Sequence, residues 1–223
     1  MFLADIRTRI DAACKTAGRD ASSVTLVAVT KTRTAAEVEP FLNAGHAAFG
    51  ENKVQEADEK WPTLKNKHPA ARLHFIGHLQ TNKCADAVRI FDVIETLDRE
   101  KLATELRREM DKQKRELPCF IQVNTGEEEQ KGGVAPREVE TLYRFCTEKL
   151  ELNIRGLMCI PPVDDIPDMH FALLHKISRE LGLHDLSMGM SSDFETAIRY
   201  GATHVRIGNA LFEKPRPPIG SLA

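Results

Sequence analysis

The 223-residue chain has no excess of charge of either sign, because 31 lysine and arginine residues nearly balance 33 aspartate and glutamate residues and leave a net charge of −2. This balance gives no broad basic surface for nucleic acid or for an anionic membrane. No apolar run approaches the ~20 residues of a membrane-spanning helix. Four charges interrupt the start of the chain, where a signal peptide would be apolar: Asp5, Arg7, Arg9 and Asp11. We therefore expect no nucleic-acid partner, no membrane association and a cytoplasmic location.

Paired cysteines are also missing. The five cysteines are scattered, odd in number and without a C-x-x-C pair: Cys14, Cys84, Cys119, Cys146 and Cys159. Neither a disulfide framework nor a zinc cluster is expected, and apolar neighbours favour small core residues over nucleophiles. His74 and His78 are four residues apart, but a strand followed by a turn does not hold them on one face. With no third ligand evident, we expect no metal site.

The chain does contain a regular alternation of short apolar runs and amphipathic segments. A helical stretch from Leu3 to Ala17 comes first, and each strand candidate except the last is followed by a clear helical segment. The eight strand candidates are Thr25–Val29, His46–Phe49, Leu73–Ile76, Val93–Thr96, Cys119–Val123, Ile154–Met158, Asp185–Met188 and Thr203–Ile207. Short β-branched strands that alternate with helices predict a parallel sheet covered by helices.

Eight such units predict an α/β fold, a single (β/α)₈ TIM barrel with an extra N-terminal helix. A doubly wound open sheet is the structural alternative. It is disfavoured because no G-x-G-x-x-G motif follows the first strand. No linker, low-complexity tract or charge block divides the chain, so we expect residues 1–223 to form one domain.

Functional groups of such a barrel gather at the carboxyl ends of its strands. Lys31 follows the first strand, so its side chain would project into the barrel mouth. Burial there favours the neutral amine, which can attack a carbonyl carbon. An exposed lysine at a strand end is the alternative. Asn52 follows the second strand near a helix start, and capping of that helix is its plain alternative role.

The loops after strands seven and eight are built from small residues. Gly189 to Asp193 precedes a helix and includes Ser191, and Gly208, Asn209 and Ala210 follow the last strand. Barrels often bind phosphate at these two loops, where backbone N–H groups can approach its oxygens. Turn and capping chemistry is the alternative explanation. Two such loops at the two expected strands favour a phosphate site.

Arg206 lies within strand eight, on the same face as His204 and Gly208 by strand alternation. A guanidinium inside a barrel needs a partner, either a structural ion pair or an atom of a bound ligand. A reactive lysine, a phosphate site and an interior arginine together favour an aldehyde cofactor that bears a phosphate. Pyridoxal 5′-phosphate (PLP) fits all three, and a phosphorylated sugar bound as a Schiff base is a weaker alternative.

Six ordered motifs over the whole length now identify a family: Val27–Thr32, Phe49–Asn52, His74–Gly77, Arg155–Met158, Leu186–Ser191 and Val205–Gly208. The chain resembles the pyridoxal phosphate homeostasis proteins. The resemblance implies a barrel like the N-terminal domain of alanine racemase, with PLP held on Lys31 as an internal aldimine. It implies that Arg206 faces the pyridine nitrogen, where like charge disfavours protonation of the ring. Asn52 would lie beside the ring, and the phosphate would be held by Ser191, Gly208 and Asn209.

The chain departs from the family pattern at three places. Thr34 and His78 stand where the family often has proline, and we expect them to alter loop stiffness more than chemistry. Asn209 stands where the family usually has threonine. It replaces a phosphate-side hydroxyl with an amide, so we expect that contact to come from backbone N–H alone.

Racemisation requires a second acid or base on the opposite face of the ligand, which alanine racemase takes from a tyrosine of a separate β domain. The two tyrosines of this chain, Tyr143 and Tyr200, fall in predicted helices away from strand ends. The sequence after strand eight leaves no room for such a domain, and His78 is a weak candidate for the second base. We expect a monomer without catalytic residues that buffers PLP or delivers it to apo-enzymes. An amino-acid racemase is the alternative.

Overall fold

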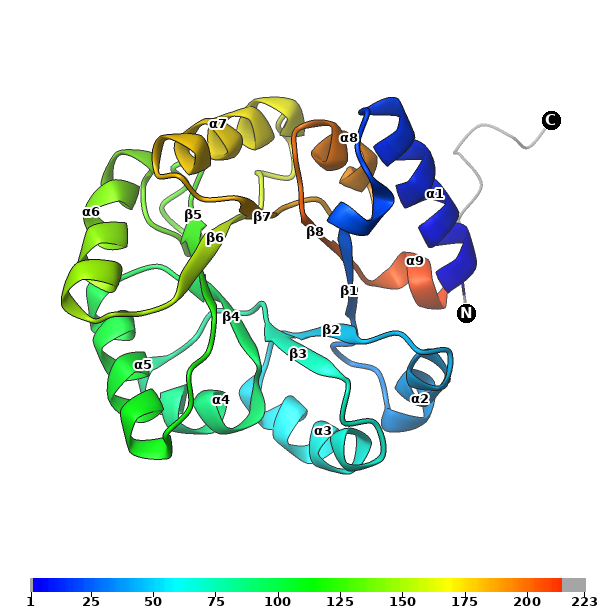
Figure 1. The fold of residues 1–223 in the computed structure, drawn as a ribbon, viewed down its shortest axis with the longest axis horizontal. Coiled ribbons are helices and arrows are strands. Elements are labelled where there is room, and N and C mark those ends of the chain that lie inside the picture. The colour runs from blue at the N-terminus through cyan, green and yellow to red at the C-terminus, as the bar shows by residue number, and fades with distance from the viewer. Residues whose placement is uncertain (1, 214–223) are drawn as a thin grey trace.

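The eight apolar runs form eight parallel strands, which pair in sequential order and close into a barrel where β8 meets β1 (Figure 1). The computed structural model describes residues 2–213. The strands are β1 (Thr25–Val29), β2 (Ala48–Glu51), β3 (Arg72–Phe75), β4 (Val93–Leu97), β5 (Cys119–Val123), β6 (Ile154–Cys159), β7 (Asp185–Ser187) and β8 (His204–Ile207). The predicted barrel is confirmed, and the open-sheet alternative is excluded.

An outer ring of helices covers the barrel (Figure 1). They are α1 (Leu3–Thr16), α2 (Ala35–Asn43), α3 (Val54–Lys67), α4 (Cys84–Ile90), α5 (Glu100–Gln113), α6 (Val139–Arg144), α7 (Pro167–Glu180), α8 (Phe194–Arg199) and α9 (Asn209–Phe212). The short α9 was not expected from the sequence. α9 is only a single turn. α1 packs against both α8 and α9 and covers the part of the barrel where a longer helix after β8 would lie.

Two predicted elements change in detail. The second strand begins at Ala48 rather than His46, because the His46 N–H donates to the carbonyl of Phe41 and closes the end of α2. The helical segment expected after the fifth strand is divided among a 3₁₀ turn, α6 and a π turn at Phe145–Lys149.

Thr34 is the N-cap residue of α2 and forms a capping box with Glu37. The sequence had predicted only a change in loop stiffness at this position. Its hydroxyl accepts from the Glu37 N–H at 3.4 Å, and its own N–H donates to the Glu37 carboxylate at 2.8 Å. Proline at position 34 would lack this N–H donor.

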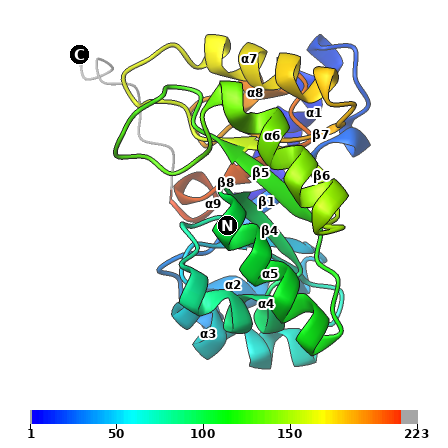
Figure 2. The same cartoon turned by 90° about the vertical axis from the view of Figure 1, so that its left-hand side faces the viewer.

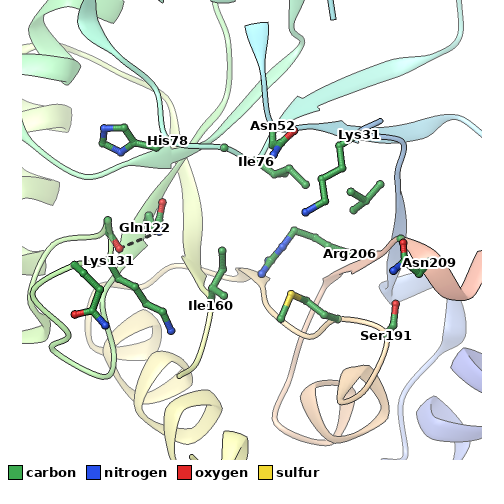
Figure 3. A pocket seen from close by; sticks show the side chains of 16 residues that line it. Lys31, Asn52, Ile76, His78, Gln122, Lys131, Ile160, Ser191, Arg206 and Asn209 are labelled. Atoms are coloured by element: carbon green, nitrogen blue, oxygen red, sulfur yellow. Dashed lines mark hydrogen bonds between the residues drawn. The ribbon is translucent and has the colours of Figure 1, made fainter. Parts of the chain in front are cut away.

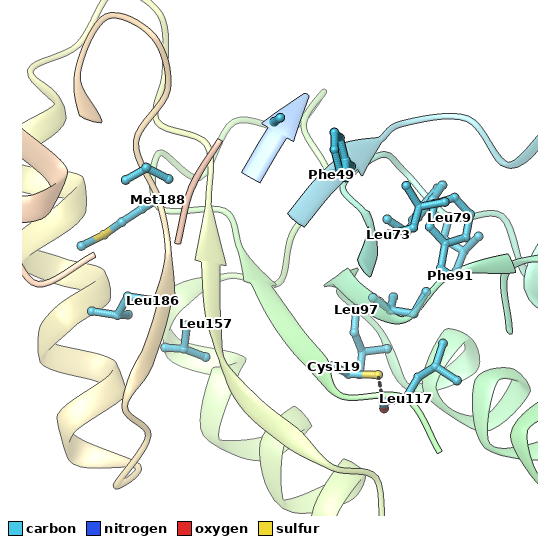
Figure 4. Close-up of a cluster of buried hydrophobic side chains, with 14 of the residues drawn as sticks. Phe49, Leu73, Leu79, Phe91, Leu97, Leu117, Cys119, Leu157, Leu186 and Met188 are labelled. Atoms are coloured by element: carbon cyan, nitrogen blue, oxygen red, sulfur yellow. Dashed lines mark hydrogen bonds between the residues drawn. The ribbon is translucent and has the colours of Figure 1, made fainter. Parts of the chain in front are cut away.

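The apolar core lies mainly between the strands and the helix ring. Phe49 of β2 packs on Trp61 of α3 with ring centroids 5.0 Å apart, and Phe75 packs on Phe91 at the same separation. Phe49, Leu73 and Phe91 belong to the cluster of buried side chains in Figure 4. All five cysteines are buried and free, which confirms them as core residues. Burial raises the pKa of four of them well above the ordinary thiol value: Cys84, Cys119, Cys146 and Cys159.

Seen from the side, the β5–α6 and β6–α7 loops extend from the end of the barrel that also carries α9 (Figure 2). This is the carboxyl end of the strands, where barrels of this type build their sites.

Gly156 permits the close pairing of β6 with β7. It pairs with Asp185, and a Cβ at position 156 would overlap the carbonyl oxygen of Asp185. We expect Gly156→Ala to destabilise the protein by about 3 kcal/mol and to lower Tm by roughly 10 °C in a thermal unfolding scan. Gly182→Ala is the control: its φ of 67° is unfavourable for alanine but the space around it is open, so it should cost only about 1 kcal/mol. Equal losses for the two variants would contradict this account.

Candidate functional site

A pocket of about 610 Å³ opens at the carboxyl end of the strands (Figure 3). It brings together all six site residues named from the sequence: Lys31, Asn52, Ser191, Arg206, Gly208 and Asn209. They come from the ends of β1, β2, β7 and β8, which lie far apart in the chain and meet because the barrel closes.

Lys31 stands on a tight turn directly after β1. The Arg33 N–H donates to the Thr30 carbonyl at 3.1 Å, and Thr32 has a left-handed φ of 62°. The amine of Lys31 extends into the pocket, toward the same space as the Arg206 guanidinium (Figure 3). Of the two alternatives that the sequence left for Lys31, the structure shows the exposed one, with the residue at the open mouth.

Asn52 faces the pocket and does not cap α3. The N-cap residue of α3 is Lys53, and no side chain caps the N-terminus of that helix. The Asn52 Oδ1 atom is buried and has no hydrogen-bond partner among the described residues. Gly77 lies directly behind it, and a Cβ there would overlap the Asn52 carbonyl oxygen, so only glycine allows this approach. The close approach of Gly77 packs against the Asn52 backbone, and the carboxamide presents an unused acceptor.

Arg206 faces the barrel interior, as the sequence predicted, and is only 4% exposed. Its Nη1 donates to the Ser187 hydroxyl at 2.7 Å, and its Nη2 donates to the Cys159 carbonyl at 2.8 Å. The Ser187 hydroxyl donates in turn to Glu95 at 2.6 Å, and the other Glu95 oxygen lies 2.6 Å from Nδ1 of His74. The guanidinium is thus held by a hydrogen-bonded chain across the barrel, while it also lines the pocket.

Glu95 is fully buried at the centre of this chain. Burial alone raises the pKa of its carboxyl, but the His74 hydrogen bond and the nearby charges of His74 and Arg206 outweigh it and lower the pKa to about 2. Burial also lowers the pKa of His204, whose ring packs on Phe120. The interior therefore holds a carboxylate that balances Arg206 through Ser187.

Sequence reasoning missed Glu95 and Ser187. A usable signal existed, because a glutamate inside the apolar run Val93–Thr96 would face either the helix ring or the barrel interior, and both are buried.

One end of the pocket is formed by the loops after β7 and β8. Ser191 and Asn209 lie on the same side of it as drawn in Figure 3. Gly189, with φ of 93°, brings the first loop against α8, since a Cβ there would lie 2.6 Å from Ala197 Cβ. Gly208 and Asn209 begin α9, so their N–H groups have no partner within that helix. This end offers a hydroxyl, an amide and two backbone donors.

The opposite wall includes Gln122 and Gly132, which the sequence did not point to, and His78, which it offered only as a weak candidate base. Gln122 donates to the Gly132 carbonyl at 3.0 Å, and Lys131 pairs with Glu128 at 2.6 Å. His78 is exposed, with Nδ1 4.0 Å from the Asp98 carboxylate. Across residues 2–213 no group of three or more His, Cys, Asp or Glu side chains is arranged to hold a metal ion.

Comparison with known proteins defines the class first. The family model described as "Alanine racemase, N-terminal domain" matches residues 3–215. Alanine racemase from Clostridium difficile is similar in fold, with a TM-score of 0.69 at 12% identity, and this chain covers 58% of that protein while 96% of its own residues are matched. The barrel is thus of the alanine racemase N-terminal type.

Closer relatives define the family. Proteins named pyridoxal phosphate homeostasis protein are 38% identical in Haemophilus influenzae and 39% in Aquifex aeolicus, over 93% and 94% of this chain and 92% and 95% of theirs. The solved structure of PipY from Synechococcus elongatus with PLP bound has a TM-score of 0.78 at 31% identity, covering 92% of this chain and all of that one. This chain belongs to the pyridoxal phosphate homeostasis protein family.

The low pKa of Glu95 predicts a pH dependence of stability. Its folded pKa of about 2 lies below the ordinary 4.5, so its contribution is complete above about pH 4.5 and is lost as the pH falls toward 2. The shift corresponds to about 3 kcal/mol. We expect Glu95→Gln to be less stable than wild type at pH 7 and to lose less stability between pH 4.5 and 2.5.

Urea unfolding at several pH values measures both quantities. Glu59→Gln, an exposed position on α3, is the control and should follow the wild-type curve. A Glu95→Gln variant with the full wild-type acid dependence would show that another group carries it.

Proposed function

We propose that this protein binds PLP reversibly through Lys31 and that it buffers or delivers the cofactor rather than catalysing a reaction. The observation that carries the proposal is the joint placement of Lys31, Arg206 and Ser191 around one pocket. The PLP-bound structure of the PipY relative supports the same assignment for this chain.

The residues present fit this cofactor. The hydroxyl of Ser191 and the N–H groups of Gly208 and Asn209 suit a phosphate, which requires several donors in close reach. The unused acceptor on Asn52 suits a donor on the ligand, such as a ring hydroxyl. Arg206 lines the pocket and would supply a fixed positive charge to the ring nitrogen of a bound PLP. Asn209 lines the pocket, so its side-chain amide can add a donor to the backbone N–H contact that the sequence led us to expect.

The chemistry that PLP supplies when bound is an aldehyde carbon, with which the neutral lysine amine forms a carbon–nitrogen double bond as one water leaves. Lys31 provides that amine. Because Lys31 is exposed at an open mouth, water and other amines can reach the linkage and reverse it. An accessible lysine therefore suits a protein that takes up and releases its ligand.

Arg206 argues against strong catalysis at this site. A permanent cation beside the ring nitrogen disfavours protonation of that nitrogen, which makes the ring a poorer electron sink. The interior chain through Ser187 to Glu95 keeps the guanidinium in place.

The pocket lining also supports a non-catalytic role. Tyr143 lies on α6 and Tyr200 at the end of α8, and neither lines the pocket. His78 lines it but is exposed, without the burial that tunes an acid or base. An amino-acid racemase remains the second candidate, favoured by the shared barrel.

We further propose that the chain acts as a single-domain monomer in the cytoplasm, with apo-enzymes that require PLP as recipients. Five buried, unpaired thiols support a reducing compartment. Among residues 2–213, no helix has both the length and the apolar character that crossing a membrane would require.

Borohydride reduction followed by peptide mapping tests the attachment. We expect the PLP label on the peptide that contains Lys31, and no label after Lys31→Ala. Lys83→Ala, an exposed lysine outside the pocket lining, is the matched control and should label like wild type. A label on another lysine in the wild-type protein would refute the assignment.

An assay for D-amino-acid formation tests the absence of catalysis. The purified protein loaded with PLP is incubated with single L-amino acids, and chiral chromatography measures the product. We expect no product above that formed by free PLP, because the pocket lacks a buried second base. Turnover that is abolished by Lys31→Ala would establish the racemase instead.

A further inference from the structure

We propose that Glu56 and Lys60 of α3 are positioning residues that hold the turn carrying Lys31 and thereby set how tightly the lysine retains its ligand. This inference rests on the proposed role of Lys31. Neither side chain lines the pocket. Both act from behind β1, on the side that faces the helix ring.

The turn itself is strained. Thr32 is β-branched and adopts φ of 62°, a left-handed conformation that such residues rarely take. The Arg33 N–H closes the turn on the Thr30 carbonyl at 3.1 Å. A strained backbone of this kind persists only where its surroundings hold it. The immediate neighbour of the strained residue is Lys31.

Two charged groups hold the turn. The Glu56 carboxylate accepts from the Thr32 N–H at 2.6 Å. The Lys60 ammonium donates to the Thr30 carbonyl at 2.8 Å, to the Arg33 carbonyl at 2.9 Å and to Glu56 at 3.2 Å. Charge-assisted bonds are stronger and shorter than neutral ones. They engage both residues that flank Lys31, together with Arg33, and leave the lysine side chain free for the pocket.

The same ammonium also contacts the end of β2, next to Asn52. Lys60 pairs at 2.7 Å with Glu51, which is fully buried and also accepts from the Thr30 hydroxyl at 2.6 Å and from Trp61 Nε1 at 3.0 Å. Glu51 immediately precedes Asn52 in the chain. One buried cluster thus ties the ends of β1 and β2 to α3 and sets the spacing of Lys31 and Asn52.

Burial of these charged groups carries a desolvation cost, so the cluster is a poor way to stabilise the fold. The second Glu51 oxygen is buried and has no hydrogen-bond partner among the described residues. Apolar side chains of similar volume often stabilise a fold as well as a buried ion pair does. Retention of three charges directly beneath one strained turn indicates that the geometry of the turn is what they maintain.

Glu56 is the better position for a test, because removing Lys60 would leave the buried Glu51 without its cation. We expect Glu56→Ala to weaken PLP binding about tenfold, the scale of one hydrogen bond to a charged group. Binding of 4′-deoxypyridoxine 5′-phosphate, which lacks the aldehyde, should stay at the wild-type level. Fluorescence titration measures both affinities.

Three further variants sharpen the test. Glu56→Gln keeps an oxygen acceptor for Thr32 and should retain most of the affinity for PLP. Glu59→Ala removes an exposed glutamate from the same helix and should behave as wild type. Lys31→Ala should lose the covalent link and retain only the affinity for the deoxy analogue.

Hydrogen exchange of the protein without PLP gives a readout independent of the ligand. The Thr32 N–H should exchange faster in Glu56→Ala than in wild type or in Glu59→Ala, since its acceptor is gone.

Equal weakening of PLP and of the deoxy analogue would reduce Glu56 to a structural role and overturn the inference, as would wild-type affinity in Glu56→Ala. If Lys31→Ala still binds PLP covalently, the proposed function itself fails. Loss of the link in Lys31→Ala together with an unchanged Glu56→Ala would overturn the positioning role alone.

Discussion

The parallel pairing of β8 with β1 is the interaction on which the site depends. It sets Val27 opposite Arg206 and Ala28 opposite Ile207, and so carries the turn of Lys31 to the rim that also bears the loop after β8. In an open sheet these two edge strands would lie at opposite sides, and the lysine and arginine could not share a pocket. Closure also creates the enclosed interior in which Glu95 can face the Arg206 chain across the barrel.

Two polar clusters, one inside the closed sheet and one outside it, orient different residues of the site. Inside it, the chain from Arg206 to Glu95 fixes a cation at the base of the pocket. Outside it, the pair of Glu51 and Lys60 fixes the backbone from which Lys31 projects. The apolar core between strands and helices stabilises the barrel, whereas these clusters fix the orientation of particular side chains. Such a division explains why charged groups persist in layers that hydrophobic residues could fill.

Most strands and helices could be predicted from the sequence, because β-branched apolar runs are typical of buried strands and amphipathic periodicity is typical of helices that cover a sheet. The four-residue α9 could not, since one turn has no periodicity to detect. The strand-end rule found Lys31, and alternation within β8 placed Arg206 inside the barrel. It could not find Lys60, which borders the apolar stripe of α3 and resembles a solvated lysine until its acceptors on β1 are known. The sequence could not decide between a buried and an exposed Lys31, because the width of a barrel mouth depends on its loops.

The outer ring closes where the first and last helices meet, with the Phe2 N–H bonded to the Leu211 carbonyl at 3.1 Å. Contacts between such distant positions are slow to form, because the loop they close is nearly the whole described chain. During synthesis on the ribosome, the barrel therefore cannot be sealed until its final strand and α9 have emerged. The loop after β8, which borders the pocket, is then among the last parts of the barrel to be assembled.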